Sequence, residues 1–121
     1  MMGDAAHAMT PWQGSGASQA IEDAMILHRL LKETKTPSQL NAALQAYDAV
    51  RRPRSQRVVA SSSITGVIMC GRASGIGLDS PEKLRSALVG RWDFIHELDM
   101  KEYQDEAVGF MNSLLEREEG K

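Results

Sequence analysis

Apolar residues recur every three or four positions along most of the chain, and no segment alternates apolar and polar residues as a strand does. A spacing of three to four residues is the period of an amphipathic helix, so the pattern predicts an all-α chain. The predicted helices run from about Ser15 to Lys32, from Thr36 to Arg52, from Arg54 to Met69, from Ser80 through Ile95, and from Asp99 through Leu114.

Local signals mark where these helices begin. Residues 36–39, which start with threonine and proline and end with glutamine, have the composition of a capping box. Residues 80–82 combine a capping serine, a first-turn proline and an acid that favours the helix dipole. Asp99 and Glu102 supply a similar start for the last helix.

Other signals interrupt or end helices. Pro53 disfavours helical geometry at Arg52, so we expect the second helix to end or kink there. Glycines at 71, 75 and 77 predict a loop, and the charged tail at 116–121 is predicted to fray. The first predicted helix has apolar residues on two flanks, which predicts burial on most of its sides.

Composition narrows the class of protein. The 121 residues, 42% hydrophobic and 25% charged, fit one soluble globular domain. A net charge of -2 gives no attraction to nucleic acid or to an anionic membrane, so neither is a predicted partner. A single cysteine, Cys70, excludes an internal disulfide and fits a reducing compartment. Because no apolar run reaches the roughly 20 residues of a membrane span, we predict a cytoplasmic protein.

Candidate ligand-binding residues are concentrated between positions 3 and 18, where glycines, a proline and a carboxylate precede an apolar helix. Glycines at 14 and 16 let the backbone approach a ligand closely. The free N–H groups of the first helical turn would then face that ligand with the positive end of the helix dipole. Asp4 offers a carboxylate that accepts hydrogen bonds from hydroxyls. Together these features suit a nucleotide cofactor.

The run Gly-Asp-Ala-Ala-His at 3–7, with Pro11, Gly-x-Gly at 14–16 and the helix at 17–24, resembles the second FAD motif of the class A flavoprotein monooxygenases. The resemblance implies an oxidoreductase that hydroxylates a small aromatic substrate with FAD, O2 and NADH or NADPH. It implies that Asp4 binds FAD hydroxyls, that Pro11 borders flavin and substrate, and that residues 14–18 hold the flavin ring. The implied cofactor-binding residues are thus Asp4, Pro11, Gly14, Ser15, Gly16, Ala17 and Ser18.

Two later segments extend the resemblance. Residues 47–54, Tyr-Asp-x-x-Arg-Arg-Pro-Arg, are similar to the family's helices after the flavin site, and residues 91–95 with 98–99 are similar to the ends of salicylate-hydroxylase-like members.

The family's ADP-binding strand and Gly-x-Gly-x-x-Gly turn are missing, and the motif follows Met1 and Met2 directly, so the chain looks cut. We therefore expect the helical C-terminal part of an α/β, Rossmann-like FAD-binding enzyme. Residues 1–35 would carry the FAD motif and its helix, and residues 36–121 a helical region, together forming one incomplete domain. Such a chain is expected to hold no flavin and to be inactive alone.

Several interpretations stay open. His7 either takes part in catalysis or satisfies backbone groups, and Trp12 either borders a substrate pocket or packs over its loop. The arginines at 51, 52, 54 and 57 are interpreted as a salt-bridged or solvated helix surface rather than a nucleic-acid site. The three histidines lack metal-site spacing, and no catalytic residue is assigned. The alternative to an enzyme fragment is a non-enzymatic helical interaction module, or a truncated relative, with possible self-association through exposed apolar helix faces.

Overall fold

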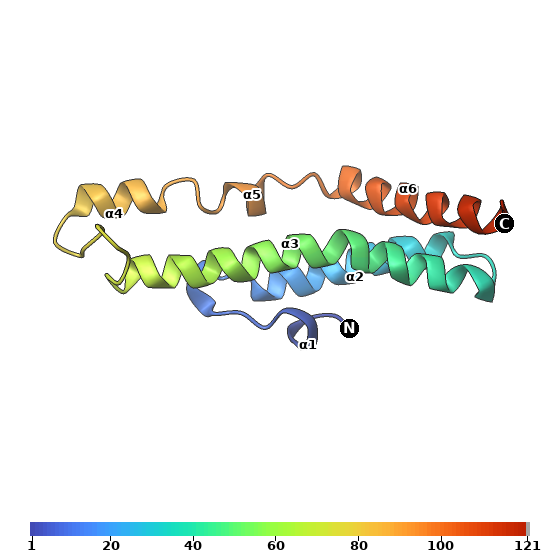
Figure 1. Cartoon of the computed structure of the whole chain (residues 1–121), viewed down its shortest axis with the longest axis horizontal. Helices are drawn as coiled ribbons and strands as arrows, with labels where there is room; N and C mark the ends of the chain where they lie inside the picture. Colours follow the sequence, from blue (N-terminus) through green and yellow to red (C-terminus); the bar gives the residue numbers. More distant parts are fainter. Residues whose placement is uncertain (121) are drawn as a thin grey trace.

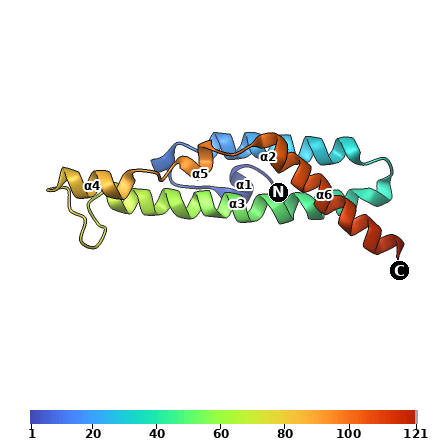
Figure 2. The ribbon, with the colours of Figure 1, turned by 90° about the horizontal axis from the view of Figure 1, so that it is seen from above.

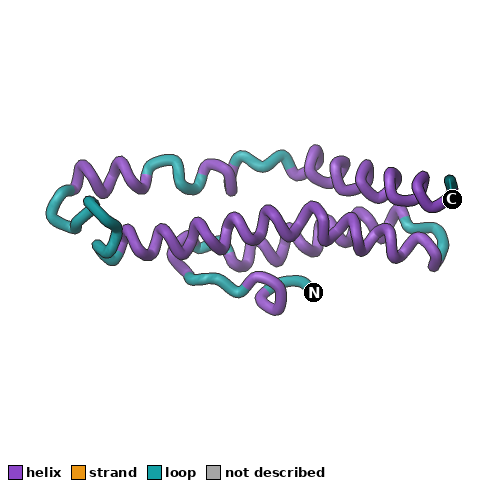
Figure 3. Tube along the Cα trace, in the orientation of Figure 1, coloured by secondary structure: helices purple, strands orange, loops and turns teal. Residues whose placement is uncertain are grey.

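A computed structural model describes residues 1–120, and the regular elements of this part are helices (Figure 1, Figure 3). No strand occurs within these described residues, which confirms the predicted all-α class. The elements are, in order, α1 (Asp4–His7), the 3-10 turn η1 (Pro11–Gln13), α2 (Gly16–Glu33), the 3-10 turn η2 (Pro37–Gln39), α3 (Leu40–Met69), α4 (Pro81–Leu88), α5 (Asp93–His96) and α6 (Met100–Glu119).

The helices form an elongated bundle around α3. Helices α2 and α3 make an antiparallel hairpin, and the chain then returns along α3 through α4, α5 and α6 (Figure 1). Figure 2 shows α6 running obliquely past the α2–α3 pair, and α6 contacts both of these helices. In Figure 1 the amino-terminal segment with α1 lies on the opposite side of the pair from α6. The amino-terminal segment therefore packs against the side of the α2–α3 pair that α6 leaves free.

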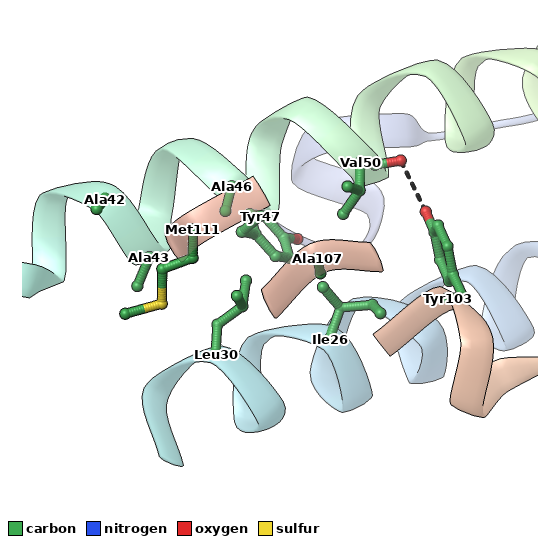
Figure 4. Close-up of a cluster of buried hydrophobic side chains, with 10 residues drawn as sticks. All are labelled: Ile26, Leu30, Ala42, Ala43, Ala46, Tyr47, Val50, Tyr103, Ala107 and Met111. Carbon is green, nitrogen blue, oxygen red and sulfur yellow. Dashed lines mark hydrogen bonds between the residues drawn. The ribbon is translucent and has the colours of Figure 1, made fainter. Parts of the chain in front are cut away.

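The hydrophobic core lies where α2, α3 and α6 meet (Figure 4). Small side chains on α3 let the three helices approach closely, and larger side chains from α2 and α6 fill the remaining space. The Tyr103 hydroxyl reaches across to donate to the Val50 carbonyl at 2.7 Å. The buried core side chains are Ile26, Leu30, Ala42, Ala43, Ala46, Tyr47, Val50, Tyr103, Ala107 and Met111.

Helix α3 continues through Pro53, so of the two predicted outcomes at Arg52, an end or a kink, the end was wrong. A proline inside a helix removes one backbone hydrogen bond and costs about 3 kcal/mol. Contacts on both sides of Pro53 offset this cost, because Arg51 and Arg54 are each bonded to Glu22 of α2. The tertiary contacts therefore override the local signal.

The single helix predicted from Ser80 through Ile95 is two helices. Ser80 caps α4 as predicted, since its hydroxyl accepts from the Lys83 N–H at 3.4 Å. Gly90 then takes a left-handed conformation, with φ of 75°, and separates α4 from α5. An α-helix has no place for that conformation, so the predicted apolar stripe is divided between two helices. Of the stripe residues Leu84, Ala87, Leu88, Trp92 and Ile95, only Ile95 is buried.

The other predicted helix starts are confirmed. The threonine–glutamine capping box at 36–39 forms, although it caps η2, which leads into α3. The Asp99 carboxylate accepts from the Glu102 N–H at 3.0 Å and caps α6.

Helix α6 extends to Glu119, so the prediction that the tail frays from Glu116 was wrong. Lys121 lies outside the described residues. The loop predicted around glycines 71, 75 and 77 joins α3 to α4.

Helix α2 has the predicted extent but not the predicted burial. Ile21 is 61% exposed, and Met25 and Leu31 are also exposed, so burial on most sides was wrong. The face packed against α3 and α6 instead carries Ile26, Leu30 and three polar residues. The polar residues are buried because charged partners on α3 satisfy them.

None of the helices in residues 1–120 has the length and apolar character that crossing a membrane requires.

Candidate functional site

An open groove of about 650 Å³ lies beside the start of α2. It is formed by the first residue of α1, the loop around η1 and the first turns of α2. Six of the seven cofactor-binding residues predicted from the sequence line it. The groove residues are Asp4, Met9, Thr10, Pro11, Gly14, Ser15, Gly16, Ala17 and Ala20. Ser18, the seventh, does not line the groove, because its hydroxyl turns back to donate to the Ser15 carbonyl at 2.8 Å.

Two glycines keep the floor of the groove clear. Gly14 has a φ of 64°, in the left-handed region, which ends the η1 turn and redirects the chain into α2. A Cβ built on Gly14 would meet no atom within 4 Å, and one on Gly16 would meet only Met9 Cγ at 4.0 Å. A side chain at Gly16 would therefore fit the fold but occupy the groove, whereas a side chain at Gly14 would be strained by the left-handed backbone.

The start of α2 gives the groove its polarity. The first N–H groups of any helix have no acceptor within the helix, and here they belong to residues 16–18. The Gln19 N–H is the first to be paired, with the Ser15 carbonyl at 3.1 Å. Since the partial positive charge of the helix dipole falls at the same place, this end of the groove suits an electron-rich oxygen or an anion. The Asp4 carboxylate provides an acceptor elsewhere in the groove.

The loop carrying Pro11 is fixed to the rest of the bundle at two places. The Ser62 hydroxyl of α3 donates to the Thr10 carbonyl at 2.6 Å. Farther along, the indole N–H of Trp92 donates to the Gln13 carbonyl at 3.1 Å, and the Gln13 amide donates to the Arg91 carbonyl at 3.1 Å. These contacts connect residues far apart in sequence, so the position of this loop depends on α3 and on the segment between α4 and α5.

Trp12 packs over α3 at Gly66, where the absence of a side chain makes room for the indole ring. A Cβ on Gly66 would lie 2.4 Å from the ring. Trp12 nevertheless remains 41% exposed and is not among the groove-lining residues. Of the two interpretations of Trp12, this geometry favours packing.

A buried ion-pair network joins α2 to α3. Its centre is Arg51 of α3, whose guanidinium donates to Asp23 and to Glu22, each at 2.7 Å. The same group donates to the Gln19 carbonyl at 3.1 Å and to the Gln19 side-chain oxygen at 3.0 Å. Arg54 adds a two-pronged contact with Glu22, at 2.7 and 2.9 Å. Because every charge has an opposite partner, the polar side chains of α2 can be buried.

The network also reaches the amino-terminal motif. One oxygen of Asp23, Oδ2, accepts from the Gly3 N–H at 2.8 Å and lies 2.6 Å from His7 Nε2. His7 and Asp23 are both buried. The histidine therefore bonds a carboxylate rather than the backbone groups considered in the sequence interpretation, and it does not line the groove.

These contacts set the protonation of the network. Burial alone raises the pKa of the Asp23 carboxyl, but the hydrogen bonds from Gly3, Arg51 and His7 together outweigh burial and hold that pKa below its ordinary value. Burial raises the pKa of Tyr47 to about 12, and the nearby Asp23 charge adds to this effect. Burial likewise raises the pKa of Tyr103. Asp23 is thus an acceptor at neutral pH, whereas the two tyrosines are donors.

The lowered pKa of Asp23 predicts how stability depends on pH. Folding favours the charged form of Asp23. The stability that this charge contributes is therefore complete above the unfolded-state pKa, near 3.8, and is lost as pH falls through the lower folded-state pKa. We expect the difference in unfolding free energy between the chain and its Asp23→Asn variant to be constant at neutral pH and to shrink below about pH 4. Urea denaturation between about pH 7 and pH 3 measures it. The Asp48→Asn substitution, at an exposed position, is the control. An equal pH dependence in both variants would contradict the lowered pKa of Asp23.

Sequence patterns pointed to only part of this arrangement. Three of the four arginines are salt-bridged as interpreted, and Arg52, for example, pairs with Asp48 on the surface. Arg57 instead lies over the Phe94 ring at 4.0 Å. Arg51, however, is buried rather than on the surface. The network residues Gln19, Glu22 and Asp23 were not identified from the sequence. Two adjacent acids within an apolar helix were the available signal.

Within residues 1–120, no group of three His, Cys, Asp or Glu side chains is placed to hold a metal ion.

The fold and the groove define a helical segment built around an FAD-type motif, and comparisons with known proteins agree. A family model described as an FAD binding domain matches residues 1–62, half of the chain. The chain belongs to this FAD-binding family of FAD-dependent monooxygenases, which confirms the resemblance stated from the motif.

Relatives match nearly the whole chain. An FAD-dependent monooxygenase of Phaeosphaeria nodorum is 40% identical over 120 residues, covering 99% of this chain and 24% of the relative. A 6-methylsalicylate 1-monooxygenase of Aspergillus terreus is 36% identical, covering 98% and 26%. A salicylate hydroxylase of Pseudomonas putida is 43% identical over 102 residues, covering 82% and 23%. The chain therefore spans about a quarter of the length of the curated relatives that it matches.

A solved structure shows the same arrangement of helices. A salicylate hydroxylase substrate complex superposes with a TM-score of 0.80 at 37% identity, covering 88% of this chain and 26% of the other. The helical fold is thus the one that a salicylate hydroxylase has over the corresponding quarter of its length.

Proposed function

We propose that this chain forms the flavin-ring side of the site in an FAD-dependent monooxygenase that hydroxylates a small aromatic substrate, with NADH or NADPH as electron donor. The observation that carries the proposal is the convergence of Asp4, Pro11 and residues 14–17 on one groove at the start of α2. The relatives' names support the substrate class, since two of them act on salicylate or a methylsalicylate.

Each part of the groove has a role in this proposal. The Asp4 carboxylate accepts hydrogen bonds from FAD hydroxyls, and the first-turn N–H groups of α2 face the pyrimidine edge of the flavin ring, where they stabilise negative charge. Pro11 borders the ring, and the missing side chains at 14 and 16 allow the backbone to approach it. FAD supplies the redox chemistry when bound, and the chain binds and orients it. None of the groove residues is assigned a proton-transfer role.

A chimera tests the proposal. This chain would replace the matching segment of the Pseudomonas putida salicylate hydroxylase, to which it is 43% identical. We expect the chimera to purify with FAD and to oxidise NADH in response to salicylate. A folded chimera with native-like helix content that carries no flavin would contradict the proposal. A version truncated before the replaced segment is the control, because it lacks this side of the site.

Removing the Asp4 carboxylate should weaken FAD binding by the chimera by about 1–3 kcal/mol, the range for losing a hydrogen-bonding partner. Asp4 is exposed on α1, so Asp4→Ala should leave the unfolding free energy nearly unchanged. Fluorescence titration of the apoprotein with FAD gives the affinity, and Asp48→Ala, which removes an exposed acid outside the groove, is the control. Equal affinities for the two variants would remove Asp4 from the site.

A further inference from the structure

We propose that Asp23 and His7 are positioning residues for FAD, which act by holding the Gly3–His7 turn so that the Asp4 carboxylate faces the groove. The proposal rests on the function proposed above, and it concerns two residues that do not themselves line the groove.

The turn is attached at both ends to a single atom. Asp23 Oδ2 accepts from the Gly3 N–H at 2.8 Å, and His7 Nε2 lies 2.6 Å from the same oxygen. Asp4 lies between these two attachments in the sequence. The two attachments hold both ends of α1 against α2, whereas a four-residue helix has no stability of its own. Gly3 has a φ of 60°, which is the region that favours glycine.

A carboxylate is the group that this arrangement requires. Asp23 is completely buried, and its second oxygen, Oδ1, is already occupied by Arg51 at 2.7 Å. An ionised carboxylate only accepts hydrogen bonds, so the proton in the contact with His7 is on Nε2. An asparagine at 23 has one oxygen and one donating amide, and it cannot accept from Gly3, His7 and Arg51 together. Asp23→Asn therefore keeps the side-chain shape but loses at least one of these three hydrogen bonds, and its uncharged oxygen accepts the remaining ones more weakly.

Few other polar contacts hold the turn. The second ring nitrogen of His7, Nδ1, has no hydrogen-bond partner among the described residues. The Tyr47 hydroxyl donates to the Met1 carbonyl only at 3.3 Å. Asp23 also joins the turn to Arg51, so the position of Asp4 depends on the contact between α2 and α3. The arrangement connects the buried network to the cofactor groove through one oxygen atom.

Nuclear magnetic resonance on the whole chain tests the positioning without flavin. We expect the Gly3 amide to be protected from hydrogen exchange and to show contacts with Ala20, whose Cβ lies 3.9 Å from a Cβ built on Gly3. Asp23→Asn should accelerate Gly3 exchange about tenfold or more while the α3 amides stay protected. Asp48→Asn, with the same change of charge on the surface, should leave Gly3 unchanged. Unaltered Gly3 exchange in a folded Asp23→Asn chain would overturn the proposal.

A second pair of variants keeps the test informative if Asp23→Asn does not fold. His7→Gln retains a donor that can reach the carboxylate, whereas His7→Leu does not. The proposal predicts that Gly3 protection and the Ala20 contacts survive better in His7→Gln than in His7→Leu. Equal loss in both, or no loss in either, would contradict a hydrogen-bonded attachment.

Flavin affinity in the chimera then tests whether the positioning acts through Asp4. Asp23→Asn and Asp4→Asn should each weaken FAD binding by about tenfold or more, and the double variant should be little worse than either single variant. Additive losses would mean that Asp23 does not act through Asp4, and the proposal would fail. If Gly3 behaves as expected but the unmodified chimera binds no FAD, the attachment holds and the proposed function fails instead.

Discussion

Replacing Arg51 by methionine should lower the unfolding free energy of the chain by about 3–5 kcal/mol, the largest effect that we expect from a single substitution. The side chain of Arg51 is only 3% exposed, and its loss leaves Asp23 and Glu22 with less charge to balance them in the interior. Removing one member of a buried ion pair costs more than the pair itself contributes, because the remaining charge has no water around it. Urea denaturation followed by circular dichroism measures the change.

The neighbouring arginine provides the control. Arg52 pairs with Asp48 on the exposed side of α3, so Arg52→Met should change the unfolding free energy by less than about 1 kcal/mol. Arg51→Lys should also destabilise, because an ammonium cannot reproduce the fork that contacts Asp23, Glu22 and Gln19 together. Equally small changes in unfolding free energy for Arg51→Met and Arg52→Met would show that the network does not stabilise the packing of α2 on α3.

Gly16→Val should reduce the affinity of the chimera for FAD by about tenfold to a hundredfold while leaving α2 intact. The effect is geometric, because the added side chain would enter the groove where the backbone is expected to approach the flavin ring. In the fold itself a Cβ at this position meets only Met9 Cγ at 4.0 Å, so the helical bundle accommodates it. Apoprotein titration with FAD gives the affinity, and thermal unfolding of the chain alone gives the stability.

Gly109→Val is the matched control, since this glycine is exposed on α6 and a Cβ there meets nothing within 4 Å. It makes the same chemical change far from the groove in sequence and should not alter FAD affinity. Ser15→Ala should be mild, because the Ser15 hydroxyl donates to the Gln13 carbonyl at 3.0 Å rather than entering the groove. A Gly16→Val chimera with normal affinity would show that the start of α2 is not the flavin contact.

Helix positions were largely predictable because their signals are local. The capping box before α3 and the Asp99 cap of α6 act within a few residues, and both occur where the sequence placed them. The errors arose at Pro53 and Gly90. At Pro53, tertiary contacts keep the helix continuous despite the proline. At Gly90, a left-handed backbone conformation ends a helix, and side-chain periodicity carries no information about it. Periodicity also misjudged α2, since it counts apolar positions and cannot recognise a buried polar face.

The groove could be predicted because its residues lie within one short motif. Asp4, Pro11 and Gly16 are close in sequence, the resemblance alone assigns them to one site, and all three line the groove. The ion-pair network that joins α2 to α3 could not be predicted in this way, because Asp23 and Arg51 are 28 residues apart and their pairing depends on how α3 packs on α2. The acid pair in one helix and the arginine cluster in another were local indications of charge pairing, but neither identified the partner.

Hydrogen–deuterium exchange of the chimera with and without FAD tests the central claim most directly, because it reports which backbone segments the cofactor covers. The claim is that the groove at the start of α2 is the flavin contact of this chain. We predict that FAD slows exchange in peptides covering residues 3–5 and 14–18, while peptides from residues 105–118 of α6 do not change. Slower exchange confined to other parts of the chain, with residues 3–18 unaffected by bound FAD, would contradict the account.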